Sequence, residues 1–168
     1  MIYGMPVSTF TTLHVAISLI ALAVGFLMVA DLLKDWHRPL VVNAFFAMTA
    51  LTSITGFMFP ATPAVTPAQI FGVVSLAAIA IAITALGFNG NRGNGITGRV
   101  FIVMSLLALY LNAFVAVFQA FQKLPPLAKI APTQSEGPFL LAQGLLLLVF
   151  TAIGWLLLRR PAAGLSTG

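Results

Sequence analysis

His14 is the one ionisable side chain that lies well inside a long apolar stretch of the sequence. Ionisable residues within membrane segments usually serve a function, because burying them in lipid is costly. His14 lies about two helical turns, or roughly 9 Å, from the start of its stretch, so water and lipid headgroups can reach it. Two roles stay open: a residue that holds helices together by hydrogen bonding, and a group that carries a proton or binds a ligand.

Haem b is the cofactor that a small histidine-bearing helical protein suggests first. Ligation by two histidines needs imidazoles on opposite faces of one porphyrin. The second histidine, His37, follows His14 by 23 positions, which corresponds to about 34 Å along a helix. We therefore expect no cofactor within one chain. A His–Met pair, or a haem shared between subunits, is the haem option that remains.

Other reactive groups are scarce. The sequence has no cysteine, which excludes disulfides and thiolate-bound metals. The run from Gly90 to Gly95 has the composition of a phosphate-binding loop, but it lacks a preceding strand and joins two apolar segments. We interpret it as a turn. No metal site and no enzyme activity are expected.

Polar and small side chains recur at helical spacing within the apolar segments. Helices in lipid associate through small residues and hydrogen bonds, so each set predicts a packing seam. The seams are His14, Ser18, Ala21 and Gly25; Thr49, Thr52, Ser53 and Gly56; Ser75, Ala78, Ala82 and Ala85; Ser105, Ala108, Asn112, Ala116 and Gln119; and Gln143, Gly144, Thr151 and Gly154.

Most of the polar side chains within the apolar segments lie in the same half of the membrane. The distribution of cations predicts that this is the outer half. A polar vestibule there is one hypothesis, roofed by the loop that carries Thr133, Gln134, Ser135 and Glu136; packing alone is the alternative. The candidate ligand-binding residues are His14, Thr52, Asn112, Gln119, Gln143 and Glu136.

Composition identifies the setting of these residues. The chain has 168 residues, of which 60% are hydrophobic and 7% charged, whereas soluble domains carry about 25% charged residues. So few charges are insufficient to cover a surface that faces water. The net charge of +5 does not indicate nucleic acid, because the cations occur in ones and twos instead of one cluster.

Five apolar stretches are long enough to cross a bilayer, which takes roughly 20 residues per helix. We predict an all-α bundle of about five transmembrane helices in a single integral membrane domain over residues 1–168. Thr66 and Gln69 form a capping box before the third helix, and Lys123 to Gly137 is the one long loop. The first stretch lacks the cationic start of a signal peptide and is expected to be retained. The predicted spans are 8–33, 39–59, 67–87, 98–122 and 138–158.

The cations predict the orientation, because Lys and Arg are enriched in cytoplasmic loops. Lys123 and Lys129 are the two cations on one side of the membrane. Six lie on the other side, which places the N-terminus outside and the C-terminus in the cytoplasm. The six are Lys34, Arg38, Arg92, Arg99, Arg159 and Arg160. Asp31 and Asp35, at the end of the first helix, could pair with Lys34 or Arg38 at helical spacing, and their surroundings are interpreted as an ordinary solvated helix end.

Three stretches of the sequence resemble a family of small uncharacterised bacterial inner-membrane proteins that span the membrane several times. The most specific is Ala131–Phe139, with its string Ala-Pro-Thr-Gln-Ser-Glu; the others are Tyr110–Val115 and Leu51–Phe57, and Thr66-Pro67 is also similar. The resemblance covers most of the chain. It implies a bacterial inner-membrane location and no particular activity.

Three functions are compatible with these features. The first is a non-enzymatic protein that acts through helix packing, as an accessory subunit of a membrane complex or as a homo-oligomer. The second is a small-molecule carrier or ligand-binding protein that uses the outer polar residues. The third, with weaker support, is a quinone- or haem-associated redox subunit. The expected partners are the lipid bilayer and other membrane subunits or further copies of the chain, with no nucleic acid.

Overall fold

The computed structural model is all-helical and describes residues 4–35, 38–59, 66–89 and 95–159. Five of its helices are long and apolar enough to cross a membrane, which confirms the predicted five-helix bundle. Their bounds agree with the predicted segments to within three residues. The helices are α1 (Val7–Leu33), α2 (Pro39–Phe57), α3 (Pro67–Asn89), α4 (Gly95–Lys123), α5 (Pro125–Ile130) and α6 (Gly137–Arg159).

Proline and a capping box begin the helices where the sequence predicts. Pro39 and Pro67 are the first residues of α2 and α3, a position where the missing N–H of proline costs nothing. The backbone N–H of Thr66 donates to Oε1 of Gln69 at 2.9 Å, and the N–H of Gln69 donates to Oγ1 of Thr66 at 3.3 Å. The predicted capping box is confirmed.

The loop between the last two long helices contains a short helix that the sequence analysis did not predict. α5 has 6 residues, and the carbonyl of Leu124 accepts from the N–H groups of Leu127 and Ala128. Ala131, just after α5, packs with Phe121 of α4 and Phe139 of α6. This small cluster fixes the turn between α4 and α6.

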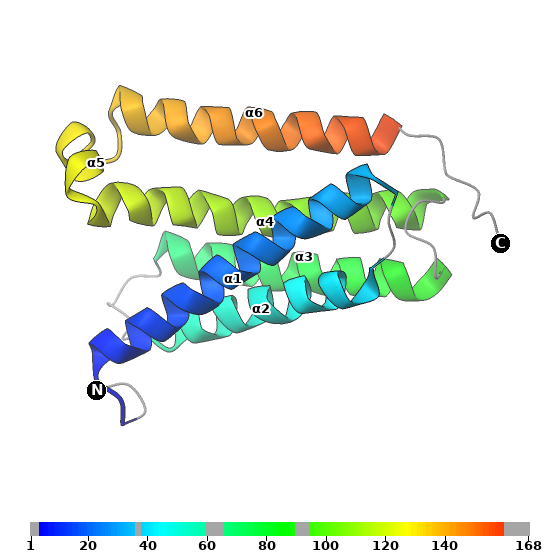
Figure 1. The fold of residues 1–168 in the computed structure, drawn as a ribbon, viewed down its shortest axis with the longest axis horizontal. Helices are drawn as coiled ribbons and strands as arrows, with labels where there is room; N and C mark the ends of the chain where they lie inside the picture. The colour runs from blue at the N-terminus through cyan, green and yellow to red at the C-terminus, as the bar shows by residue number, and fades with distance from the viewer. Residues whose placement is uncertain (1–3, 36–37, 60–65, 90–94, 160–168) are drawn as a thin grey trace.

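α4 is the central helix. Of the 18 most apolar consecutive residues of α4, 44% are buried, whereas 17% of the corresponding residues of α6 are buried. α3 and α6 both pack against α4, and α2 packs between α1 and α3. α1 is inclined across the bundle, with its C-terminal end near α6 and its N-terminal end away from it (Figure 1). The ring of Phe26 on α1 lies 6.3 Å from that of Phe150 on α6.

A tight crossing joins α1, α2 and α4 in the half of the bundle near the C-terminus of α1. Gly25 of α1 faces Phe45 of α2 and Leu109 of α4, both fully buried. A Cβ atom at Gly25 would lie 2.9 Å from the Phe45 ring and closer still to Leu109. Phe101 and Met28 complete the buried core at this level.

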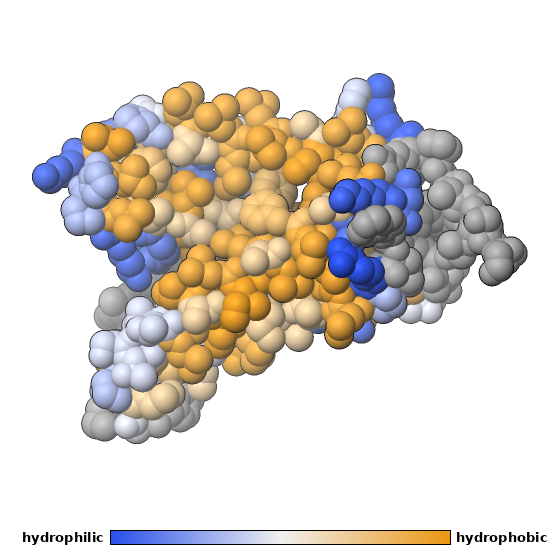
Figure 2. All heavy atoms as spheres, viewed as in Figure 1, coloured by the Kyte–Doolittle hydropathy of each residue, from blue (hydrophilic) through white to orange (hydrophobic). Residues whose placement is uncertain are grey.

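The surface of the bundle is apolar around its middle. Figure 2 shows hydrophobic residues over the central part of the visible face and hydrophilic residues gathered towards its two ends. All five long helices contribute exposed large hydrophobic side chains. Such a belt between polar ends is what a membrane protein presents to lipid.

The predicted seam positions are all buried or half-buried on α1 to α4, but two of the four on α6 are exposed. Ser75, Ala78, Ala82 and Ala85 of α3 are all buried, whereas Gly144 and Thr151 of α6 are exposed. α6 packs through Phe139, Gln143, Phe150 and Leu157. The prediction for Gly144 and Thr151 is therefore wrong within the single chain: α6 packs mainly on α4, and bulky residues form that contact.

The end of α1 also differs from the prediction. Asp31 is only 3% exposed, and its carboxylate accepts two hydrogen bonds from the Arg38 guanidinium, one of them at 2.8 Å from Nε. This hydrogen bond with Asp31 raises the pKa of Arg38. Asp31 is thus part of a bidentate ion pair that joins the end of α1 to the start of α2, and it is not an ordinary solvated residue.

Replacing Gly25 by alanine should destabilise the bundle, because the new methyl group must displace two fully buried side chains. Overpacking of this kind costs about 1–3 kcal/mol. Gly154→Ala is the matched control, since its Cβ would lie 3.5 Å from Leu106, an ordinary contact. Circular dichroism during SDS titration measures the difference. Equal unfolding of the two variants would contradict a tight crossing at Gly25.

Candidate functional site

His14 is held between α1 and α2. Its Nδ1 lies 2.8 Å from Oγ1 of Thr55, and Thr55 donates its own hydroxyl proton to the carbonyl of Leu51 at 2.7 Å. With the Thr55 proton on the Leu51 carbonyl, Nδ1 donates to Thr55, and Nε2 is then the acceptor of the neutral ring. The ring of Phe59 packs edge-on against the imidazole at 5.3 Å. His14 thus joins two helices, and one ring nitrogen stays available.

Asn112 bridges α4 and α2 in the interior. Its Nδ2 donates to Oγ1 of Thr49 at 3.0 Å, and Thr49 is fully buried. Gln143 makes a similar bridge from α6, because its Nε2 donates to the backbone carbonyl of Phe114 on α4 at 3.2 Å. Each polar side chain thus connects a different pair of helices.

Glu136 is bound by its own loop. Oε1 accepts from the backbone N–H and the hydroxyl of Thr133 at 3.1 and 2.8 Å, and Oε2 accepts from the N–H of Ser135 at 3.1 Å. Partial burial acts to raise the pKa of Glu136, but these hydrogen bonds from Thr133 and Ser135 outweigh it and lower the pKa. The carboxylate acts as a loop clamp immediately before α6 begins.

Three candidate residues have buried oxygens that lack a hydrogen-bond partner among the described residues. They are Oγ1 of Thr52, Oε1 of Gln119 and Oε1 of Gln143; Oγ of Ser105, which was not a candidate, is a fourth such atom. Buried acceptors of this kind usually have a partner, so each indicates an unfilled hydrogen-bonding position. Thr52, Gln119 and Gln143 all lie in the half of the bundle near α5, the end predicted to face outward.

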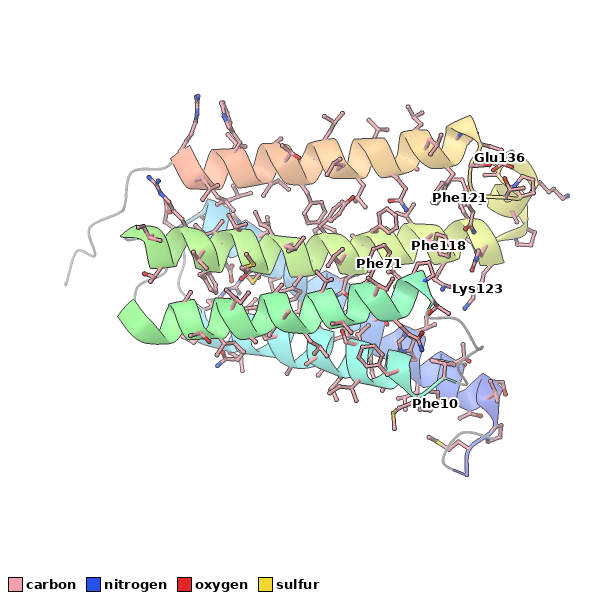
Figure 3. All side chains as sticks on the ribbon, turned by 180° about the vertical axis from the view of Figure 1, so that it is seen from behind. Phe10, Phe71, Phe118, Phe121, Lys123 and Glu136 are labelled. Carbon is pink, nitrogen blue, oxygen red and sulfur yellow. The ribbon has the colours of Figure 1, made fainter. Side chains whose placement is uncertain are left out.

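The six candidate residues are not gathered into one site by direct contacts. Within the described ranges, no hydrogen bond joins one candidate residue to another. In Figure 3, Glu136 and Lys123 lie at the same end of the bundle as Phe10, but Phe10 lies well apart from them on α1. The candidate residues of the predicted vestibule therefore form separate polar contacts at one end of the bundle, and no direct contact unites them. In the same described ranges no three potential metal-ligating side chains cluster, and His37 lies outside these ranges.

Serine and threonine hydroxyls within the helices are largely satisfied locally. Thr11, Ser18, Thr84 and Thr151 each donate to the carbonyl four residues earlier. This back-bonding lets a hydroxyl sit in apolar surroundings without a partner helix. Sequence reasoning missed Thr49 and Thr55 as partners of Asn112 and His14, since the sequence alone does not determine which helices are neighbours.

Comparison with known proteins does not add a relative. No family model, no curated protein and no solved structure matches the chain. The geometry of the described residues is therefore the basis for the functional proposals below, and the family resemblance stays a prediction.

The Asn112–Thr49 hydrogen bond should contribute measurably to stability. A double-mutant cycle with Asn112→Leu and Thr49→Val is expected to give a coupling of about 0.6 kcal/mol, the average for hydrogen bonds between membrane helices. SDS unfolding of the wild type, the two single variants and the double variant supplies the four values. Strict additivity of the two substitutions would show that the bond contributes nothing.

Proposed function

We propose that this chain is a non-enzymatic protein of the bacterial inner membrane that acts through helix packing, as an accessory subunit of a membrane complex or as a homo-oligomer. In this proposal its N-terminus is outside and its C-terminus is in the cytoplasm. The six-to-two distribution of cations supports the orientation.

One observation carries the packing proposal: α6 has a second seam that no helix in the described part of the chain covers. Leu140, Gly144, Leu147 and Thr151 are exposed and follow one another at spacings of four, three and four residues. Positions with this alternation line one face of a helix and form the contact in helix pairs. Gly144 and Thr151 are also small residues of the kind that allow close approach in lipid.

The contrast with the other helices strengthens the argument. The seam residues of α3 are all buried, and those of α1, α2 and α4 are buried or half-buried. α6 lies at the edge of the bundle (Figure 1), and its buried residues, which pack on α4, lie about a quarter turn away from this seam. A helix from another subunit could pack on this seam as α3 packs on α4.

Cysteine cross-linking tests the seam directly, because the sequence has no cysteine of its own. If two copies pack through α6, Gly144→Cys and Thr151→Cys should form disulfide-linked dimers in native membranes treated with copper phenanthroline. A disulfide needs Cβ atoms about 3.5–4.5 Å apart. Val149→Cys is the matched control, since Val149 is also exposed on α6 but lies almost half a turn away from the seam.

The mass of the particle extracted in lipid discs distinguishes a homo-oligomer from an accessory subunit of a larger complex. A particle of two or more copies of the 17.7 kDa chain identifies a homo-oligomer, and a particle with a second polypeptide identifies an accessory subunit. In the second case, Gly144→Leu should release the partner. A monomer without cross-links at Gly144 or Thr151 would overturn the proposal.

A second function, a carrier or ligand-binding protein, is favoured by the unpartnered buried oxygens. Gln119 and Gln143 each have a buried Oε1 without a described partner, and Nε2 of His14 is also an available acceptor. A ligand with hydrogen-bond donors could satisfy such acceptors. These groups lie in the half of the bundle that carries most of the candidate residues.

A thermal-shift screen of the pure protein with small polar compounds tests this second function. A binding compound should raise Tm in the wild type, and the shift should disappear in Gln119→Leu/Gln143→Leu. Ser105→Ala is the control, because it removes a similarly unpartnered buried oxygen in the other half of the bundle. A Tm shift that persists in the double-leucine variant would place the ligand elsewhere.

A further inference from the structure

A groove lies between α4 and α6 at the end of the bundle where most of the cations occur. It measures about 330 Å³ and is lined by Ile96, Arg99, Val100, Val103 and Met104 of α4 and by Leu158 of α6. The α4 residues follow the spacing of a single helix face. Arg99 therefore stands within a stripe that is otherwise fully apolar.

Arg99 has no hydrogen bond or ion pair with any residue in the described part of the chain, and it is exposed. An arginine side chain on an apolar face can lay its methylene groups along that face and direct its guanidinium towards the headgroup level. Arg99 lies in the second turn of α4, and Leu158 lies in the last turn of α6. The charge thus stands at the polar end of the groove.

The surroundings add positive charge and an interfacial aromatic. Arg159 stacks over the ring of Trp155, with its guanidinium carbon 3.9 Å from the ring centroid. Trp155 precedes Leu158 by three residues, so both lie on the same side of α6. Among the described acids at this end, Asp31 is neutralised by Arg38.

We propose that this groove is a binding site for an anionic phospholipid, with the phosphate at Arg99 and one acyl chain along Val100, Val103 and Met104. From Arg99 to Met104 the stripe rises about 7.5 Å, enough to hold the first part of an acyl chain. Basic pockets between membrane helices are typical binding sites for anionic headgroups. Leu158 follows Thr151 by seven residues and so lies on the same face of α6 as the packing seam, but the groove is formed mainly by residues of α4.

A second groove provides an internal comparison. It measures about 320 Å³, lies between α2 and α3, and is lined by Asn43, Phe46, Ala47, Ala50, Ile79, Ile83 and Leu86. Its size matches the first groove, but its lining carries no charge. Lipid in this second groove should therefore not be selected by the charge of its headgroup, in contrast to lipid in the Arg99 groove.

Native mass spectrometry of the full chain in mild detergent tests the proposal, with phosphatidylglycerol and phosphatidylcholine of identical acyl chains as probes. The wild type should retain one phosphatidylglycerol in preference to phosphatidylcholine. Arg99→Gln should weaken phosphatidylglycerol binding about five-fold, which corresponds to the ~1 kcal/mol of one basic residue near a lipid surface. Val103→Phe should weaken binding of both lipids, because it fills the path of the acyl chain.

Two control variants separate the groove from general effects. Lys34→Gln removes a charge at the same end of the bundle from α1, and Ala47→Phe fills the uncharged groove; both should retain wild-type selectivity. Equal losses in Arg99→Gln and Lys34→Gln would overturn the proposal in favour of diffuse attraction. Displacement of the lipid by soluble glycerol phosphate would also overturn it, since the acyl chain would then contribute nothing. Helicity by circular dichroism verifies that each variant folds.

Discussion

The contact at Gly25 sets the arrangement of the other helices. Because Gly25 has no side chain, the backbone of α1 lies directly against Phe45 of α2 and Leu109 of α4. In lipid there is little hydrophobic force between helices, so van der Waals contact at such close approaches holds them together. Once α1, α2 and α4 are fixed, α3 packs on α2 and α4, and α6 packs on the remaining side of α4.

The two halves of the bundle are stabilised differently. Around Gly25 the interior is filled by aromatic and aliphatic side chains such as Phe45, Phe101 and Leu109. Towards α5, hydrogen bonds join the helices in pairs: His14 with Thr55, and Gln143 with the carbonyl of Phe114. These bonds are directional but few, and they leave buried oxygens without a partner.

Hydropathy alone was sufficient to predict the five long helices, because each needs a long apolar run and little else. The capping box was also predictable, since Thr66 and Gln69 are neighbours in sequence. The short α5 was missed because hydropathy detects only long segments. Pairing of Asp31 with Arg38 was one of the possibilities that the spacing offered. The burial of Asp31 was not predicted, because it depends on the path of the turn between α1 and α2. The lining of the Arg99 groove was equally hidden, since it depends on α4 and α6 being neighbours.

The helices differ in length, and this has a mechanical consequence for the surrounding lipid. α2 has 19 residues and α4 has 29, which correspond to about 28 and 43 Å, whereas the hydrocarbon core of a bilayer is about 30 Å thick. α1 has 27 residues, and its inclination shortens the depth that it occupies (Figure 1). α4 lacks that freedom at the centre of the bundle, so in a bilayer its end with Lys123 would stand beyond the hydrocarbon. A bilayer around this protein would have to be thinner beside α2 than beside the α4–α6 hairpin. This difference between helix length and bilayer thickness would favour lipids with shorter chains next to α2 and lipids with longer chains next to α4 and α6.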